Sequence, residues 1–242
     1  MENLIVYHAE NQKIRLGSKN DGGYVIVDLP DNYDFFISGG IGNDSNFEKD
    51  FVQKYNIKGI GFDGSKKLKI TNINNFTFIK KNLGSINDDK TSNLVEYIKK
   101  YNNLFLKIDI EGHEFRLFPE LIKNNLMKNI KQFVVEIHSP NDINLFPKYF
   151  KGLQDINNDF MFNLLKDFNK THTLVHFHAN NGCKMATYDN IQLPHVFELT
   201  FIRNENIKDK IKNKETFPTE LDSKNIKNKK DYYFDHYPYC NK

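Results

Sequence analysis

The sequence predicts an α/β fold, a doubly wound and mostly parallel sheet of seven strands. Short apolar runs alternate with segments whose apolar residues recur at helical spacing. A repeated order of strand, helix and strand implies right-handed crossovers between parallel strands. The last two runs, residues 173–179 and 196–203, have no helix between them, so we expect them to pair as an antiparallel hairpin at one edge. A further β-hairpin is expected at the N-terminus.

Length and composition fit one domain. The chain has 242 residues and a formal net charge of +3, with 34 Lys and Arg against 31 Asp and Glu. So mild a charge does not indicate binding to nucleic acid, which would be favoured by a strong positive field, and we expect no nucleic-acid partner. Cys183 and Cys240 provide no disulfide framework or metal spacing. Residues 1–8 lack a signal-peptide pattern, and no apolar stretch approaches a membrane span. We therefore expect a soluble cytoplasmic protein.

Residues 14–28 predict the N-terminal hairpin. Two runs rich in Ile, Val and Leu flank the sequence Asp21-Gly22-Gly23. Asp-Gly and Gly-Gly pairs are typical of two-residue hairpin turns. We expect the tight turn at 21–22 or at 22–23.

Residues 33–48 have the form of a strand, a glycine-rich turn and the start of a helix. The turn includes Gly39, Gly40 and Gly42, which let a ligand approach the backbone closely. Ser45 and Glu48 match the spacing of a capping box. A helix N-terminus at this point would offer free N–H groups to an anionic group.

The second strand, residues 58–63, ends in Asp63. A carboxylate about 20 residues after a glycine-rich turn is placed to bind ribose hydroxyls. The alternative is that Asp63 is only a turn residue before Gly64.

The remaining elements follow in order. Expected strands span 76–79, 104–109 and 132–138, and expected helices span about 88–100, 115–122 and 161–168. The third strand leads into Asn82. Prolines and a glycine mark 139–158 as a looser insertion near the ligand-binding edge, and Pro194 excludes a helix before the last strand.

The fourth strand ends in an acidic, glycine-broken turn. Asp109, Glu111, His113 and Glu114 surround Gly112 there. Ligands of open α/β sheets bind outside the carboxyl ends of the strands, so Asp109 and His113 are placed for chemistry. The alternative is an ordinary acidic surface turn.

Together these segments resemble the class I S-adenosylmethionine-dependent methyltransferases of the FkbM type, a Rossmann-like family. The resemblance spans about residues 14–203 and is carried by residues 21–25 (DGGYV), 38–44 (SGGIGND), 107–114 (KIDIEGHE), 135–138 (VEIH) and 178–181 (HANN). It implies one methyltransferase domain over 1–203, followed by a Lys- and Asn-rich tail over 204–242.

The resemblance also implies the cofactor-binding residues. These are Tyr24, Gly39, Gly40, Gly42, Asn43, Asp44, Asp63, Asn82 and Asp109. The first strand departs from the pattern, because it ends in Ser38 and Gly39 where many class I enzymes place an acid. Asp44 or Asp109 would have to face the methionine amino group instead.

Methyl transfer to a hydroxyl needs a base or a metal that lowers the hydroxyl pKa. His113 is the better-placed base and His138 is its competitor, with Asp109 beside them. Asp109, Glu136 and His138 stand at neighbouring strand ends and could hold Mg²⁺ or Mn²⁺. The alternative is that Glu136 and His138 form a structural hydrogen bond.

Enzymes of the resembling family commonly methylate sugars. We therefore expect O-methylation of a sugar hydroxyl in a glycan or nucleotide-sugar, with N-methylation of an amino sugar as the alternative. The same sheet could also serve a nucleotide-binding oxidoreductase or epimerase, or a non-catalytic binding module. The expected partner is a small molecule or glycan, and a homo-oligomer is left open. Residues 204–242 are either solvated or a basic ligand-gripping arm, and their aromatic end docks on the domain or on a second subunit.

Overall fold

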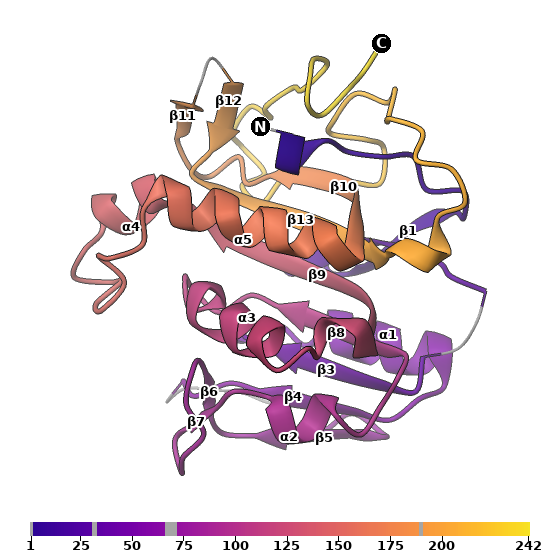
Figure 1. The fold of residues 1–242 in the computed structure, drawn as a ribbon, viewed down its shortest axis with the longest axis vertical. Coiled ribbons are helices and arrows are strands. Elements are labelled where there is room, and N and C mark those ends of the chain that lie inside the picture. Colours follow the sequence, from indigo (N-terminus) through magenta and orange to yellow (C-terminus); the bar gives the residue numbers. More distant parts are fainter. Residues whose placement is uncertain (1, 31–32, 66–71, 189–190) are drawn as a thin grey trace.

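The computed structural model describes residues 2–30, 33–65, 72–188 and 191–242 (Figure 1). Within these residues, seven strands form one sheet in the order β10-β13-β9-β8-β3-β4-β5. Their bounds are Phe35–Gly39 (β3), Gly59–Phe62 (β4), Phe76–Ile79 (β5), Leu104–Ile108 (β8), Ile130–His138 (β9), His172–Ala179 (β10) and Val196–Arg203 (β13). Strands β5, β4, β3, β8 and β9 run parallel, and β13 is antiparallel to both β9 and β10. The predicted sheet and its edge hairpin are confirmed.

The chain reverses direction across the sheet between β3 and β8. It moves outward from β3 through β4 to β5, and then returns to β8 on the other side of β3. Gly39, the last residue of β3, lies beside Ile108, the last residue of β8. Such a switch point opens a crevice at the carboxyl ends of the two strands.

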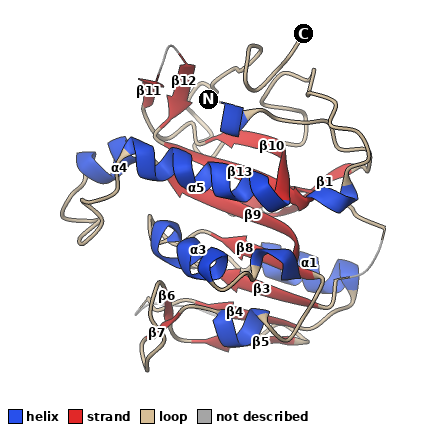
Figure 2. Cartoon of the chain, viewed as in Figure 1, coloured by secondary structure: helices blue, strands red, loops and turns tan. Residues whose placement is uncertain are grey.

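Helices cover both faces of the sheet (Figure 2). In the described residues, the α-helices are Asn46–Tyr55 (α1), Val95–Ile98 (α2), Glu114–Lys123 (α3), Pro140–Leu145 (α4) and Asn158–Thr171 (α5). Short 3₁₀ turns span Glu2–Leu4, Met127–Asn129 and Asn204–Asn206. Helices α3 and α5 pack together on one face, and α1 packs against the N-terminal hairpin on the other.

Strand β8 is buried on both faces. Phe105 belongs to an aromatic cluster with Phe36 and Phe51, and its ring lies 4.2 Å from that of Phe51. Leu106 belongs to the larger cluster under α3 and α5. Side chains of a strand alternate between its faces, so an unbroken apolar run indicates a strand that is covered twice. This burial fixes the position of the acidic turn that follows β8.

The N-terminal hairpin is confirmed, but its turn is wider than predicted. Strands β1 (Lys13–Gly17) and β2 (Gly23–Val27) pair antiparallel around the loop 18–22. The guanidinium of Arg15 donates hydrogen bonds to the carbonyls of Ser18 and Asn20, at 3.1 and 2.9 Å. These bonds stabilise the longer loop in place of a two-residue turn.

The helix predicted over about 88–100 is wrong in its first half. The Asp88 carboxylate accepts hydrogen bonds from the backbone N–H groups of Lys90 and Thr91, which turns the chain before a helix can begin. Residues Asn82–Leu83 (β6) and Thr91–Ser92 (β7) pair there instead. Leu94 has a φ of 60°, so α2 begins only at Val95.

The insertion after β9 contains more structure than predicted. Helix α4 begins at Pro140, the first-turn position at which proline is tolerated.

Between β10 and β13, strands β11 (Met185–Tyr188) and β12 (Ile191–Pro194) form a separate two-stranded sheet. Residues 191–194 thus form a strand that ends at Pro194, and the helix that this proline was predicted to exclude does not form there.

The C-terminal segment 204–242 packs on the domain. Phe217, Phe234 and Tyr239 are buried, and the rings of all three contact Phe177 of β10. The aromatic end thus docks on its own chain, while most of its lysines are exposed. The boundary at residue 203 stays a prediction. Cys183 and Cys240 are free thiols, and every helix in the described ranges is too short or too polar to cross a bilayer.

Candidate functional site

A cavity of about 980 Å³ lies at the switch point between β3 and β8. Residues from the ends of β3, β4 and β8 line it, together with the loop 81–86. The predicted site residues in its lining are Gly40, Gly42, Asn43, Asp44, Asp63, Asn82, Asp109 and His113. Gly39, Tyr24, Glu136 and His138 are not in the lining. The structure thus brings most of the predicted cofactor residues together around one space.

Two glycines of the turn after β3 have different roles. Gly40 has a φ of 73°, and a Cβ there would lie 1.5 Å from the backbone oxygen of Asp109. Only glycine lets the turn pass so close to β8. Gly42 has a φ of 61°, and a Cβ there would meet nothing within 4 Å. Gly40 is therefore required by the fold, whereas Gly42 leaves open space for a ligand.

Asp63 holds the glycine-rich turn in shape. Its Oδ2 accepts hydrogen bonds from the backbone N–H groups of Ile41 and Gly42, at 3.1 and 2.8 Å. Its Oδ1 accepts one from Ser65 at 2.7 Å. Asp63 therefore occupies these two turn amides, which precede the N-terminus of α1. The ribose role of Asp63 stays a prediction.

The capping box predicted from Ser45 and Glu48 is wrong. The Ser45 side chain makes no cap hydrogen bond, and the first-turn N–H of Asn46 is bound by Asp44 Oδ1 at 2.9 Å instead. Glu48 is fully buried and accepts a 2.6 Å hydrogen bond from Ser38 Oγ. Ser38, which stands near the end of the first core strand where many class I enzymes place an acid, thus has its hydrogen-bond partner inside the protein and not in the cavity.

A buried lysine completes this support. The Nζ of Lys107 lies 3.6 Å from Glu48 and donates a 2.8 Å hydrogen bond to the carbonyl of Gly40. Its side chain is only 5% exposed. A buried charge needs such partners, since desolvation would otherwise cost several kcal/mol. The pair ties α1, β8 and the glycine turn together beneath the cavity.

Tyr24 reaches the site through Asp109. The Tyr24 hydroxyl donates a 2.7 Å hydrogen bond to Asp109 Oδ2. Burial is the main cause that raises the pKa of Tyr24 well above 10, and the negative charge of Asp109 raises it further. The hydroxyl therefore stays protonated and orients the carboxylate at the cavity wall.

His138 stands among carboxylates. Its Nδ1 lies 2.8 Å from Asp142, and its Nε2 lies 3.3 Å from Glu111 and 3.4 Å from Glu136. Burial alone would lower the pKa of His138, but the carboxylates of Asp142 and Glu136 outweigh it and raise that pKa well above 6.5. Burial, with Asp109 nearby, raises the pKa of Glu136.

The donor set for a metal differs from the predicted one. Among the described residues, Asp109, Glu111 and His138 can bring one ligand atom each within 4.8 Å of one another. Glu111 was not among the predicted candidate ligands, although it lies in the same turn, has a φ of 54° and lies 3.3 Å from His138 Nε2. Glu136 is beside this group, and its Oε1 accepts a 3.5 Å hydrogen bond from Asn180.

The environment of His113 differs from that of the buried His138. His113 precedes α3, is exposed and lines the cavity. Partial desolvation is the main cause that lowers the pKa of His113 below 6.5, and the positive charge of Arg116 lowers it further. The imidazole is thus neutral near pH 7 and can accept a proton.

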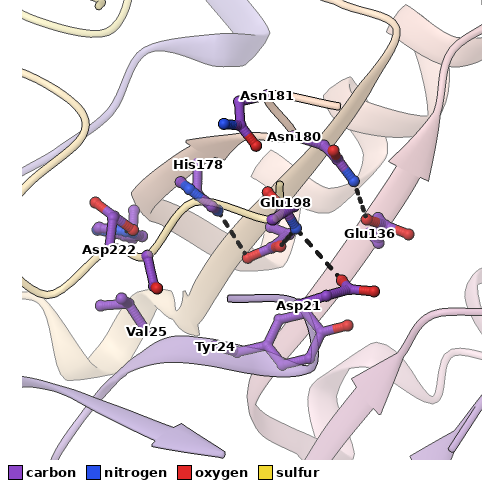
Figure 3. A network of polar contacts seen from close by, with 12 residues as sticks. Asp21, Tyr24, Val25, Glu136, His178, Asn180, Asn181, Glu198 and Asp222 are labelled. Atoms are coloured by element: carbon purple, nitrogen blue, oxygen red, sulfur yellow. Dashed lines mark hydrogen bonds and ion pairs between the residues drawn. The ribbon is translucent and has the colours of Figure 1, made fainter. Parts of the chain in front are cut away.

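A polar network continues from the cavity across the sheet (Figure 3). Asn225 of the C-terminal segment donates to Asp21, at 3.4 Å, and to Glu198, at 3.3 Å. Glu198 also lies 3.2 Å from His178, and Asp222 lies 2.8 Å from His176. Because Asp21 lines the cavity, the C-terminal segment forms part of the support of the site.

Comparisons with known proteins gave likenesses of structure only. No family model matches the chain, and no curated protein matches it. A chain of the complex between the Haloferax volcanii Trm112 methyltransferase activator and a methyltransferase aligns with 8% identity over 72% of this chain and 85% of its own, at a TM-score of 0.42.

Two further solved structures align in the same way. The methyltransferase domain of bacterial CtHen1-C has 15% identity over 71% of this chain and 90% of its own, at a TM-score of 0.39. The plantazolicin methyltransferase BamL, solved with a triazolic desmethylPZN analog and SAH, has 15% identity over 70% of this chain and 77% of its own, at a TM-score of 0.37.

Proposed function

We propose that this protein is an S-adenosylmethionine-dependent methyltransferase that acts on a sugar hydroxyl. The observation that carries the proposal is the cavity at the switch point. Asp63 and Asp109 line it, and so does Gly42, beside which there is open space. The resemblance of residues 107–114 to the FkbM-type enzymes supports the same activity. The two free thiols fit a reducing compartment such as the cytoplasm.

The cavity fits the cofactor better than it fits a dinucleotide. The amides of Ile41 and Gly42 are bound to Asp63, and Ser45 stands where a third glycine would be expected, so the turn is not arranged around a pyrophosphate. Bound S-adenosylmethionine would supply a methyl group on a sulfonium. Asp63 and Asn82 would bind the ribose, and Asp44 or Asp109 would face the methionine amino group.

A divalent cation fits beside the cofactor cavity. His138 is 7% exposed, and its Nε2 makes no hydrogen bond within the described residues although Glu111 and Glu136 lie close. One imidazole nitrogen and two carboxylates form a donor set suited to Mn²⁺ or Mg²⁺. Asp109, Glu111 and His138 would hold the ion, which would displace the proton from His138 Nε2, and Asp142 would orient the imidazole through Nδ1. The ion would lower the pKa of an acceptor hydroxyl.

The acceptor side of the cavity is lined by groups that bind hydroxyls. Asp21 and Glu111 offer carboxylates, and Tyr149 offers an exposed aromatic ring. His113, which lines the same cavity, would take the hydroxyl proton, and Asp142, which contacts His138 Nδ1, would hold that imidazole for metal binding. Since transfer from a sulfonium is an in-line displacement, the remaining work of the protein is alignment and exclusion of water.

An amino sugar is the second candidate acceptor. The carboxylates of Asp21 and Glu111 at the cavity favour a cation, which an amino sugar would provide. A deprotonated amine needs no metal and little help from a base, so loss of His113 would matter less.

The test uses S-adenosylmethionine with a deuterated methyl group and a panel of sugars, nucleotide-sugars and amino sugars. We expect mass spectrometry to detect one transferred methyl on a hydroxyl-bearing acceptor. His113→Gln should lower kcat by about 10² to 10⁴, the range for a positioned base, with SAH affinity unchanged. The matched control is His8→Gln, an exposed histidine of the N-terminal segment. Transfer only to amines, with His113→Gln unaffected, would reassign the acceptor.

A further inference from the structure

The last residue of α4 and the loop that follows it expose large apolar side chains. Within residues 145–151, here called the rim loop, Leu145 is 43% exposed, Phe146 53% and Tyr149 65%. A single exposed Leu is common on protein surfaces, but three large apolar residues in one short loop form a patch. In Figure 1 the rim loop projects from the body of the molecule beside α4.

The rim loop is firmly held, so its exposure is not the result of fraying. Phe150 and Leu153 anchor it and are 3% and 1% exposed. Gln154 donates hydrogen bonds to the carbonyls of Pro147 and Phe150, at 3.2 and 2.7 Å. Arg116 of α3 donates one to the carbonyl of Gly152 at 2.9 Å. The fold thus presents Leu145, Phe146 and Tyr149 outward from a fixed base.

The charges of the rim loop are positive. Lys148 and Lys151 are exposed, and neither is paired with an acid in the described part of the chain. The nearby Asp155 is already neutralised by Arg116. Lysines beside Leu, Phe and Tyr are typical of surfaces that bind anionic membranes, where the apolar groups enter the interface and the ammonium groups meet lipid phosphates.

The rim loop also stands at the mouth of the cavity. Tyr149 lines the cavity, and so does Ile86, which is 57% exposed on the loop after β6. Tyr149 shares the cavity lining with Glu111, one of the proposed metal ligands. A surface that covers the rim loop would therefore face the opening of the site.

We propose that the rim loop docks this protein on the surface of an anionic lipid bilayer. A second copy of the chain is a poorer occupant, because three half-exposed side chains offer on the order of 300 Å², well below the roughly 800 Å² per partner of a stable interface. If the proposed methyltransferase activity holds, docking presents the cavity to a sugar carried on a lipid. That second step rests on the proposed function, whereas the docking itself does not.

The test is flotation of the purified full chain with vesicles, without cofactor. We expect binding to vesicles of phosphatidylcholine with phosphatidylglycerol, and weak binding to phosphatidylcholine alone. The double variant Leu145→Ser with Phe146→Ser should weaken binding by at least about tenfold, because it removes the inserted groups. Lys148→Glu with Lys151→Glu should weaken it by a similar factor through charge.

The matched control is Tyr233→Ser, which removes an aromatic residue that is 73% exposed in the C-terminal segment. It should bind vesicles as the wild type does. Wild-type binding by the rim-loop variants, no binding of wild type to anionic vesicles, or a dimer that the double variant dissociates would each overturn the proposal. Calorimetry with SAH on the same variants reports separately on the cofactor site, so failure of docking is distinguishable from failure of the proposed function.

Discussion

The hydroxyl of Tyr24 and the Oδ2 of Asp109 are joined by a 2.7 Å hydrogen bond. Tyr24 belongs to the N-terminal hairpin, and Asp109 follows β8 at the switch point of the sheet. The contact links a hairpin outside the main sheet to a carboxylate in the cavity wall. The hairpin is thus part of the site rather than an appendage.

Replacing Tyr24 with Phe tests this link. The ring should keep its edge contact with Phe47, at 5.4 Å, and its position under Lys107, so the variant removes the hydroxyl alone. We expect the free energy of unfolding to fall by about 1.5 to 3 kcal/mol, as for a hydrogen bond to a charged group. Urea denaturation measures it, with the exposed Tyr237→Phe as control. Equal stability of Tyr24→Phe and wild type would contradict the role.

Replacing Asp63 with Ala should weaken SAH binding by one to two orders of magnitude. The variant loses the expected ribose contact and leaves the amides of Ile41 and Gly42 without their partner. Loss of hydrogen bonds to a charged group costs about 1.5 to 3 kcal/mol, which matches that decrease. Calorimetry gives the dissociation constant, and Asp235→Ala, at an exposed acid, is the control. Unchanged affinity would remove Asp63 from the site.

Replacing Glu111 with Gln separates the proposed metal set from the one predicted by sequence. If Asp109, Glu111 and His138 hold the ion, Glu111→Gln should weaken Mn²⁺ binding by at least about tenfold, while Glu136→Gln should have a smaller effect. Electron paramagnetic resonance of Mn²⁺ titrations measures the affinity of both variants.

Chelation should also abolish turnover, and added Mg²⁺ or Mn²⁺ should restore it. Full turnover after exhaustive chelation would leave only proton transfer and positioning.

His172 should make the protein sensitive to acid. Burial lowers its pKa to about 4, and its ring lies 2.9 Å from the carbonyl oxygen of Ile130. The unfolded chain has a His pKa of about 6.5, so the stabilisation is full above pH 6.5 and is lost as pH falls towards 4. The loss should approach about 3 kcal/mol.

The measurement is urea denaturation of wild type and His172→Gln between pH 7 and about 4. The variant should be less stable at pH 7 but should lose less stability on acidification. The control is His236→Gln, at an exposed histidine. Parallel pH profiles of wild type and His172→Gln would show that the burial of His172 does not set the acid response.

The sheet was predictable from local pattern, because strands buried on both faces are apolar throughout. Strand β8, with Phe105 on one face and Leu106 on the other, is an example. The end of such a strand also indicates where the site lies, which is why Asp109 and His113 were found in the cavity lining.

What sequence pattern could not predict depends on contacts between distant residues. Glu48 has the spacing of a capping residue, but it turns inward because Ser38 and Lys107 offer buried partners. The Asp88 turn competes locally with helix formation, and its effect depends on the pairing of β6 with β7. Glu111 joins His138 only because a left-handed backbone follows Asp109. Each of these outcomes requires knowing which side chains meet in space.

Thermal denaturation with SAH and with NAD⁺ tests the proposed cofactor most directly. A ligand present at 100 times its dissociation constant stabilises a protein by about 2.7 kcal/mol, which shifts the melting temperature measurably. We expect SAH to raise the melting temperature of the wild type, NAD⁺ to leave it unchanged, and Asp63→Ala to lose most of the SAH shift. A shift with NAD⁺ and none with SAH would contradict the methyltransferase assignment.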